Sequence, residues 1–276
     1  MNAVFDFNRW LLYIGKHWNE NKKKYLLSLG AIAGLLVLWY SFTMLVNLNG
    51  AFRRDNQAIA YYVGLVLTGC LFASLMFSDL NEGATAIHFL LVPVSALEKL
   101  LCAFLFSAVL FFISYTLIFY VVDFSMVSIS NNLIETAAKR DHVIANTQDV
   151  INVFQAPPEQ GDNFYIYLLT LFVGVQSAFL LGSVYFVKFN FIKTTVSVFI
   201  IFVAFMLVVH KLMHLFMPHG DFADPFTIYR VWQPDNTQVA ILLPVWLSNI
   251  LLFLFKYTLA PVFWVATYFR LKEKEV

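Results

Sequence analysis

The stretch FSDLNEGATAIHFLLVPVSALEK, residues Phe77–Lys99, decides the architecture of this chain, because it places a short helical pattern between two long apolar segments. Asp79 is expected to cap the start of the short helix, since an aspartate side chain accepts hydrogen bonds from free N–H groups at a helix start. Glu82 and Thr85 keep its first turn polar. The stretch therefore predicts a polar helix in a loop between two apolar helices.

The second half of this stretch contains a stop signal and a start signal. Pro93 ends the short helix, because proline lacks an amide hydrogen and its ring clashes with the preceding turn. Ser95 with Glu98 three residues later predicts a capping box at the start of the next helix.

The composition indicates a membrane protein. Hydrophobic residues make up 60% of the 276 residues and charged residues only 13%, against about 45–50% and about 25% in soluble domains. A net charge of +1, without a basic cluster interleaved with aromatic residues, gives no support for nucleic-acid binding. The two cysteines, Cys70 and Cys102, lie in apolar segments and exclude a disulfide framework. Residues 1–20 lack the pattern of a cleaved signal peptide, so the first span is expected to act as an uncleaved insertion signal.

About six segments are long and apolar enough to cross a bilayer, which takes about 20 residues. They are Tyr25–Val46, Ala58–Phe77, Leu100–Val122, Phe164–Val187, Thr194–Val209 and roughly Pro244–Phe269. An even number places both termini on one side, and lysine and arginine in short loops favour the cytosol. The basic residues on the side of the termini are Arg9, Lys16, Lys22, Lys23, Lys24, Lys99, Lys188, Lys193, Arg270, Lys272 and Lys274; those on the other side are Arg53, Arg54, Lys139, Arg140, Lys211 and Arg230. The termini and the 78–99 segment are therefore predicted to be cytosolic in a multi-pass protein.

Residues 1–24 predict an amphipathic helix before the first span. Val4, Phe7, Leu11, Ile14 and Trp18 recur at steps of three and four, which places them on one helical face. Such a helix is typical of the membrane interface. The alternative is a helix packed on a partner protein.

Two segments are expected on the outer side. The first, 123–163, is a long loop with one helix-like run, Leu133–Phe154. The second, 210–239, carries three prolines and a glycine that would break a continuous helix, so broken outer helices, external or re-entrant, are expected before the last span. With no internal repeat, 1–276 is interpreted as a single, all-α membrane domain.

Residues that carry chemistry are scarce. The first five spans contain essentially no charge, and Gln176 is their main polar residue at mid-depth, which disfavours an ion-coupled transporter. Lys256 in the last span is the exception; we interpret it as a snorkelling or bundle-facing residue, with a functional role as the alternative. Catalytic and phosphate-loop motifs are missing, so the chain is not expected to be an enzyme or to hold a cofactor. Nucleotide energy would have to come from another chain.

A histidine cluster raises the question of a metal site. His210 and His214 are four residues apart, with His219 nearby. Imidazole suits a transition metal, but the ligand set is incomplete and an interfacial helix commonly carries histidine at its polar edge. We assign no metal site.

Small residues form stripes that allow helices to approach closely. They are Gly30 and Gly34 in the first span, and Gly174, Ala178 and Gly182 in the fourth. The stripes favour tight packing, within the bundle or against a second subunit.

The loop stretch and the architecture together resemble the type-two ABC exporter permease family, in which an E-x-x-T helix is followed by a P-V-S turn and the next span. The residues that carry the resemblance are Asp79, Glu82, Thr85, Pro93, Val94, Ser95, Glu98 and Lys99, and the ending Tyr268–Val276 is also similar to bacterial members. The likeness covers the whole chain as topology and about twenty residues as motif.

The resemblance implies a permease subunit in the bacterial inner membrane, surrounded by lipid, that pairs with itself or a homologue and recruits two ABC ATPase subunits. Residues 82–91 would be the coupling helix. The ATPase-coupling residues would be Asp79, Glu82, Thr85, His88, Pro93 and Ser95. Family members move lipids, glycans, peptides, drugs or ions, so the substrate stays open. The alternative is a membrane scaffold that anchors a cytosolic partner without transport, while an intramembrane enzyme would need polar catalytic groups that the spans lack.

Overall fold

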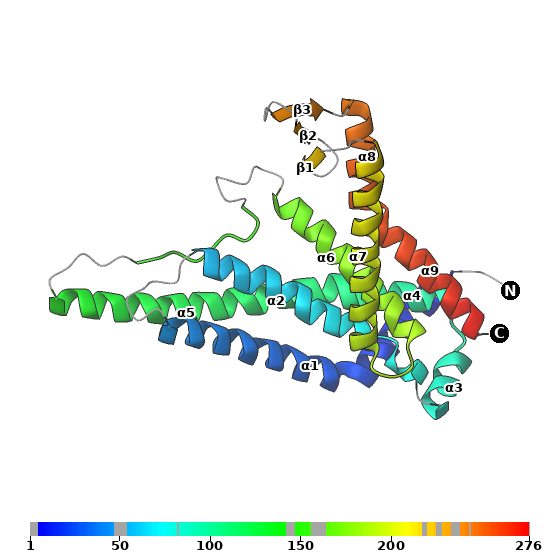
Figure 1. The fold of residues 1–276 in the computed structure, drawn as a ribbon. Coiled ribbons are helices and arrows are strands. Elements are labelled where there is room, and N and C mark those ends of the chain that lie inside the picture. Colours follow the sequence, from blue (N-terminus) through cyan, green and yellow to red (C-terminus); the bar gives the residue numbers. More distant parts are fainter. Residues whose placement is uncertain are drawn as a thin grey trace.

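A computed structural model describes residues 5–46, 54–81, 83–141, 147–155, 164–216, 220–224, 228–232, 238–242 and 244–275. Within these residues, six helical stretches are long and apolar enough to cross a bilayer, as expected of a multi-pass membrane protein. These stretches are Phe7–Val46, Arg54–Leu80, Ala96–Arg140, Ile166–Tyr185, Asn190–Val208 and Val245–Lys274. Both termini and the loop helix between the second and third stretches lie at one end of the bundle (Figure 1).

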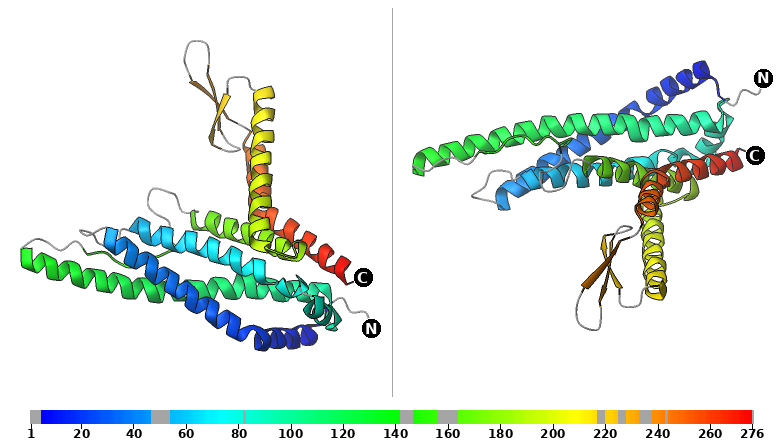
Figure 2. Two further views of the ribbon diagram at one scale, coloured as in Figure 1. Left: turned by 60° about the horizontal axis from the view of Figure 1, so that its bottom comes forward. Right: turned by 90° about the horizontal axis from the view of Figure 1, so that it is seen from above.

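The first helix, α1 (Phe7–Val46), runs without interruption over 40 residues. The predicted interfacial helix and first span are therefore one helix, bent in its N-terminal part (Figure 2). The polar run at 19–24 contains no proline or glycine that would end a helix. Phe7, Leu11 and Trp18 of the predicted apolar face are exposed, while Tyr13 is buried and packs in the bundle. An interfacial position for this face stays a prediction.

The third membrane-crossing stretch is built from three pieces that follow the loop helix. After α2 (Arg54–Leu75) come the 3₁₀ turn η1 (Ser78–Asn81) and the loop helix α3 (Gly83–Leu91), then α4 (Ala96–Phe104), the π-helical turn η2 (Leu105–Leu110) and α5 (Phe111–Asp141). α5 continues well past the predicted end of the span at Val122, so the predicted outer loop 123–163 starts as a helix.

The expected helix-like run Leu133–Phe154 is only partly helical. Helix α5 ends at Asp141, and residues 147–155, which we call the outer segment, are not helical. Side chains of α2 hold the outer segment: Gln57 Oε1 accepts from the N–H of Ile151 at 2.9 Å, and the Tyr62 hydroxyl donates to the Val153 carbonyl at 2.7 Å. These contacts satisfy backbone groups that a helix would have satisfied internally.

The last part of the chain departs from the expected broken outer helices. It comprises α6 (Phe164–Tyr185), α7 (Asn190–Phe216), β1 (Gly220–Asp224), β2 (Ile228–Trp232), β3 (Gln238–Leu242), α8 (Val245–Tyr257) and α9 (Leu259–Lys274). The three strands form an antiparallel sheet in the order β1-β2-β3. β2 is rich in aromatic and β-branched residues, which favour strands. The correction therefore concerns 220–224, 228–232 and 238–242, which form strands and not broken helices.

Helices α7 and α8 stand at a steep angle to α1, α2 and α5, with the sheet at the far end of α7 (Figures 1 and 2). α8 ends at Tyr257 and α9 begins at Leu259. Pro261 in the first turn of α9 cannot donate a backbone hydrogen bond to the preceding turn, which accounts for the break between the two helices.

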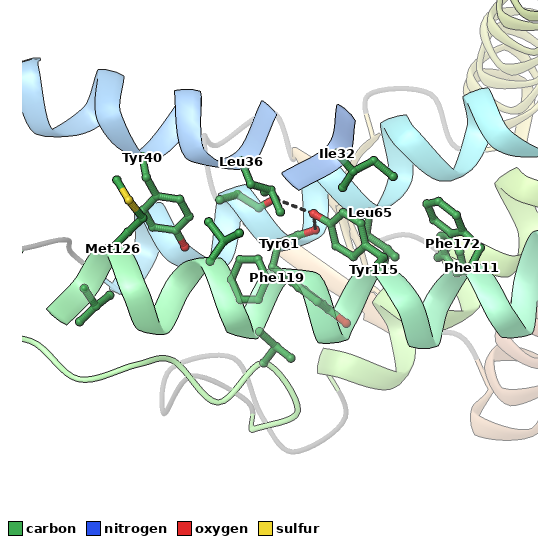
Figure 3. Close-up of a cluster of buried hydrophobic side chains, with 14 residues drawn as sticks. Ile32, Leu36, Tyr40, Tyr61, Leu65, Phe111, Tyr115, Phe119, Met126 and Phe172 are labelled. Atoms are coloured by element: carbon green, nitrogen blue, oxygen red, sulfur yellow. Dashed lines mark hydrogen bonds between the residues drawn. The ribbon is translucent and has the colours of Figure 1, made fainter. Parts of the chain in front are cut away.

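The largest core cluster joins α1, α2, α5 and α6 and is rich in tyrosine and phenylalanine. Figure 3 shows Tyr61, Tyr115 and Phe119 packed beneath Leu36 of α1. The Tyr115 hydroxyl donates to the backbone carbonyls of Ala60 and Tyr61, at 3.1 Å and 3.0 Å. Buried phenol groups are thus satisfied without water, as a membrane interior requires.

Candidate functional site

The loop helix α3 has the position that the sequence predicts. It ends at Leu91, two residues before Pro93. Asp79 does not cap it, because this residue lies in the 3₁₀ turn η1, where the Leu80 N–H donates to the Phe77 carbonyl. The chain turns once before α3 begins, which moves Asp79 away from the start of the helix. Glu82 lies outside the described residues.

The predicted capping box at the start of α4 is confirmed. The Ser95 hydroxyl accepts from the Glu98 N–H at 3.3 Å, and the Glu98 carboxylate accepts from the Ser95 N–H at 2.9 Å. Because α3 and α4 are separated by four residues only, this box fixes the direction in which the chain leaves the loop helix.

Helix α3 is amphipathic rather than polar throughout. Phe89 packs edge-on against Phe77, with ring centroids 6.1 Å apart. Ile87 and Leu91 point away from the bundle, with 61% and 75% of their surface exposed. His88 and Thr85 are also exposed. The outer face of α3 therefore presents two aliphatic side chains beside polar groups at the end of the bundle that carries both termini.

Glu98 has a second role that the sequence reading missed. Its side chain is fully buried and receives the Arg9 guanidinium at 2.7 Å and 2.8 Å from Nη2 and Nε. The Asp6 N–H donates to the same carboxylate at 2.7 Å. One buried carboxylate thus joins the start of α4 to the start of α1 by charge-assisted hydrogen bonds.

Lys99, the next residue, makes the equivalent connection to the other terminus. Its ammonium group is buried and lies 2.7 Å from the Glu275 carboxylate, just after α9. It also lies 5.0 Å from the centroid of the Phe89 ring of α3, within range of a cation–π interaction. We call Arg9, Glu98, Lys99 and Glu275 the terminal clamp.

The sequence contained one signal for the terminal clamp. Glu98 and Lys99 are adjacent, opposite charges at the start of an apolar span. Charged side chains are costly there unless each has a partner of opposite charge. Their partners are about 90 and 176 positions away along the chain, so spacing alone did not identify them.

The predicted packing stripes divide into two groups. A Cβ atom added at Gly30, Gly34 or Gly174 would meet nothing within 4 Å. Gly182, by contrast, lies directly against Thr194 of α7, where an added Cβ would overlap the side chain, and Ala178 is buried. Two close-packed glycines were missed: Gly64, against Tyr115, and Gly69, against Phe172 and Phe111.

Lys256 lies 3.5 Å from the centroid of the Tyr167 ring of α6, in agreement with a bundle-facing position. His210 is exposed, whereas His219 and the side chain of His214 lie outside the described part of the chain. Among the residues that the structure describes, no three His, Cys, Asp or Glu side chains are grouped to hold a metal ion.

Comparisons of the chain with protein-family models, with curated proteins and with solved structures found no match.

Proposed function

We propose that this chain is the membrane-spanning permease subunit of an ABC transporter in the bacterial inner membrane, using ATP hydrolysed by a separate ATPase subunit. The observation that carries the proposal is the loop helix α3, which exposes Ile87 and Leu91 and is followed directly by the terminal clamp. The resemblance of this loop to the type-two exporter permeases supports the same conclusion.

The terminal clamp connects the loop helix, through α4, to the first and last helices of the chain. A force on α3 passes through the Ser95 capping box into α4. From there Glu98 transmits it to α1, and Lys99 transmits it to the end of α9. Each pair has one buried and one partly exposed partner, and we infer that these bonds make the linked elements move as a rigid body, one of the known types of switching motion. An ATPase that pushes on α3 would therefore move the first, third and last spans as a unit.

The exposed face of α3 is suited to a protein partner. Aliphatic side chains in the centre of a contact with polar groups at its rim are typical of protein interfaces. The excess of basic residues on this side predicts that this end of the bundle faces the cytosol. The face fits an apolar groove on an ATPase subunit. The open Gly30 and Gly34 stripe would be available to a second permease subunit, self or homologue.

The test is ATP hydrolysis by the complex purified through a tag on this chain and reconstituted into liposomes. Ile87→Glu and Leu91→Glu should remove the ATPase subunit and the activity together, because each places a charge in a desolvated contact. Leu133→Glu, which alters an equally exposed leucine on the outer part of α5, is the matched control and should leave both unchanged. A partner that remains bound without hydrolysing ATP would contradict transport and favour the scaffold.

A further inference from the structure

The third membrane-crossing stretch contains a π-helical turn that no proline or glycine explains. η2 spans Leu105–Leu110 between α4 and α5, and the sequence from Ala96 to Asp141 contains neither residue. The Phe111 N–H donates to two carbonyls, that of Phe106 five positions back and that of Ala108 three positions back. π-helical turns are rare and occur frequently at functional sites. This one divides the inner half of the stretch, next to the loop helix, from the outer half.

A side chain from another helix forms a hydrogen bond with a backbone carbonyl of this π-helical turn. When hydrogen bonds change from five-residue back to four-residue steps, one carbonyl loses its place in the ladder. The Ser107 carbonyl, next after Phe106, accepts a hydrogen bond from Nε2 of Gln176 on α6. Both residues are buried. Because lipid offers no water to a free carbonyl, Gln176 stabilises the π-helical form.

The Gln176 side-chain amide has only one of its two polar atoms in a hydrogen bond among the described residues. Gln176 Oε1 is buried and has no hydrogen-bond partner among the described residues. The space beside it, lined by residues including Phe104, Ala108 and Trp264, is too small to admit a water molecule. A buried, unpaired amide oxygen is costly. The π-helical form thus has one hydrogen bond at Ser107 and leaves the Gln176 amide oxygen unpaired, so Gln176 stabilises it only in part.

We propose that η2 is a hinge that alternates between the π-helical and α-helical forms, with the Gln176 side chain as its latch. Changing one form into the other shifts the inner half by one residue, which turns it by about 100° and moves it by about 1.5 Å relative to the outer half. Because α4 follows α3 in the chain, this rotation would also move α3. The inference concerns the motion of this helix alone and holds whether the chain is a permease or a scaffold.

The experiment measures the distance between spin labels on either side of the hinge in the full chain in lipid nanodiscs. Cysteines at Leu91, at the end of α3, and at Val121, on α5, replace exposed side chains. The native Cys70 and Cys102 are buried, which limits background labelling. The wild-type chain should give two distances. Gln176→Met should lower the π-helical population about threefold, which is the effect expected from losing one interhelical hydrogen bond in lipid.

Two further variants keep the test decisive. Deleting Val109 removes the extra residue of η2 and should leave a single distance. Ser177→Ala is the matched control, since the Ser177 hydroxyl donates to the Gly174 carbonyl of its own helix, and this variant should behave as wild type. A single wild-type distance that Gln176→Met leaves unchanged would overturn the hinge. If the deletion variant does not fold, the comparison of Gln176→Met with Ser177→Ala decides alone.

Discussion

The contribution of the terminal clamp to stability can be measured at the ion pair between Lys99 and Glu275. Its two sides differ in exposure: the Lys99 side chain is 1% exposed and the Glu275 side chain 26%. Glu275→Gln therefore leaves a buried ammonium group without its counter-charge. Lys99→Met leaves a carboxylate that water can reach. The first change should be more destabilising than the second.

The expected loss in free energy of unfolding follows from this difference in exposure between Lys99 and Glu275. Losing one partner of a fully buried ion pair costs about 3–5 kcal/mol. The Phe89 ring stays beside the Lys99 ammonium at 5.0 Å, and Glu275 is partly hydrated in the folded protein. We therefore expect Glu275→Gln to lower the free energy of unfolding by about 2–3 kcal/mol. The double variant, which has no unpaired charge, should lose less than the sum of the single losses, with a coupling of about 1–2 kcal/mol.

Unfolding in mixed micelles with increasing SDS, followed by far-UV circular dichroism, measures these differences. Glu273→Gln is the control, because Glu273 forms an exposed pair with Arg270 one turn earlier on the same helix; we expect a change below about 0.5 kcal/mol. Additive single and double variants, or a Glu275→Gln variant as stable as the control, would refute the reasoning.

Three further predictions concern topology, packing and the outer segment. Single cysteines at Glu135 and Lys272 should react with an impermeant reagent from opposite faces of the membrane, and labelling of both from outside intact cells would refute the orientation. Gly182→Ala should lower the free energy of unfolding by about 1–3 kcal/mol, because the new methyl group overlaps a side chain of α7. Gly174→Ala on the same helix has open space and should cost nothing; equal effects would contradict the packing. Gln57→Leu should raise hydrogen exchange in the outer segment about tenfold without unfolding the bundle, since it removes hydrogen bonds worth about 1–1.5 kcal/mol, and unchanged exchange would show that this side chain is not the anchor.

The features that the sequence predicts correctly are local. The six apolar stretches follow from length and hydropathy alone. The end of α3 before Pro93 and the capping box of Ser95 and Glu98 each depend on residues within a few positions of one another. Such signals need no knowledge of the rest of the fold.

The features that it does not predict depend on distant contacts or on competing local preferences. The sequence predicts a separate helix over 1–24, yet nothing in the polar run after Trp18 stops a helix, and α1 continues to Val46. Prolines between 210 and 239 were interpreted as breaks in helices, although β2 and β3 pair as strands. The partners of Glu98 and Lys99 come from the two ends of the chain, and only the assembled bundle brings them together.

The most direct test of the central claim is a site-specific cross-link from the loop helix in native membranes. A photoreactive amino acid at Leu91, whose side chain is 75% exposed, should form a covalent adduct with an ATP-binding cassette subunit, identified by mass spectrometry. The same amino acid at Leu133, on the outer part of α5, should not. A Leu91 adduct with the ATPase subunit that is missing at Leu133 is the predicted result. Adducts at Leu91 that contain only lipid, or a protein without a nucleotide-binding domain, would contradict the proposal.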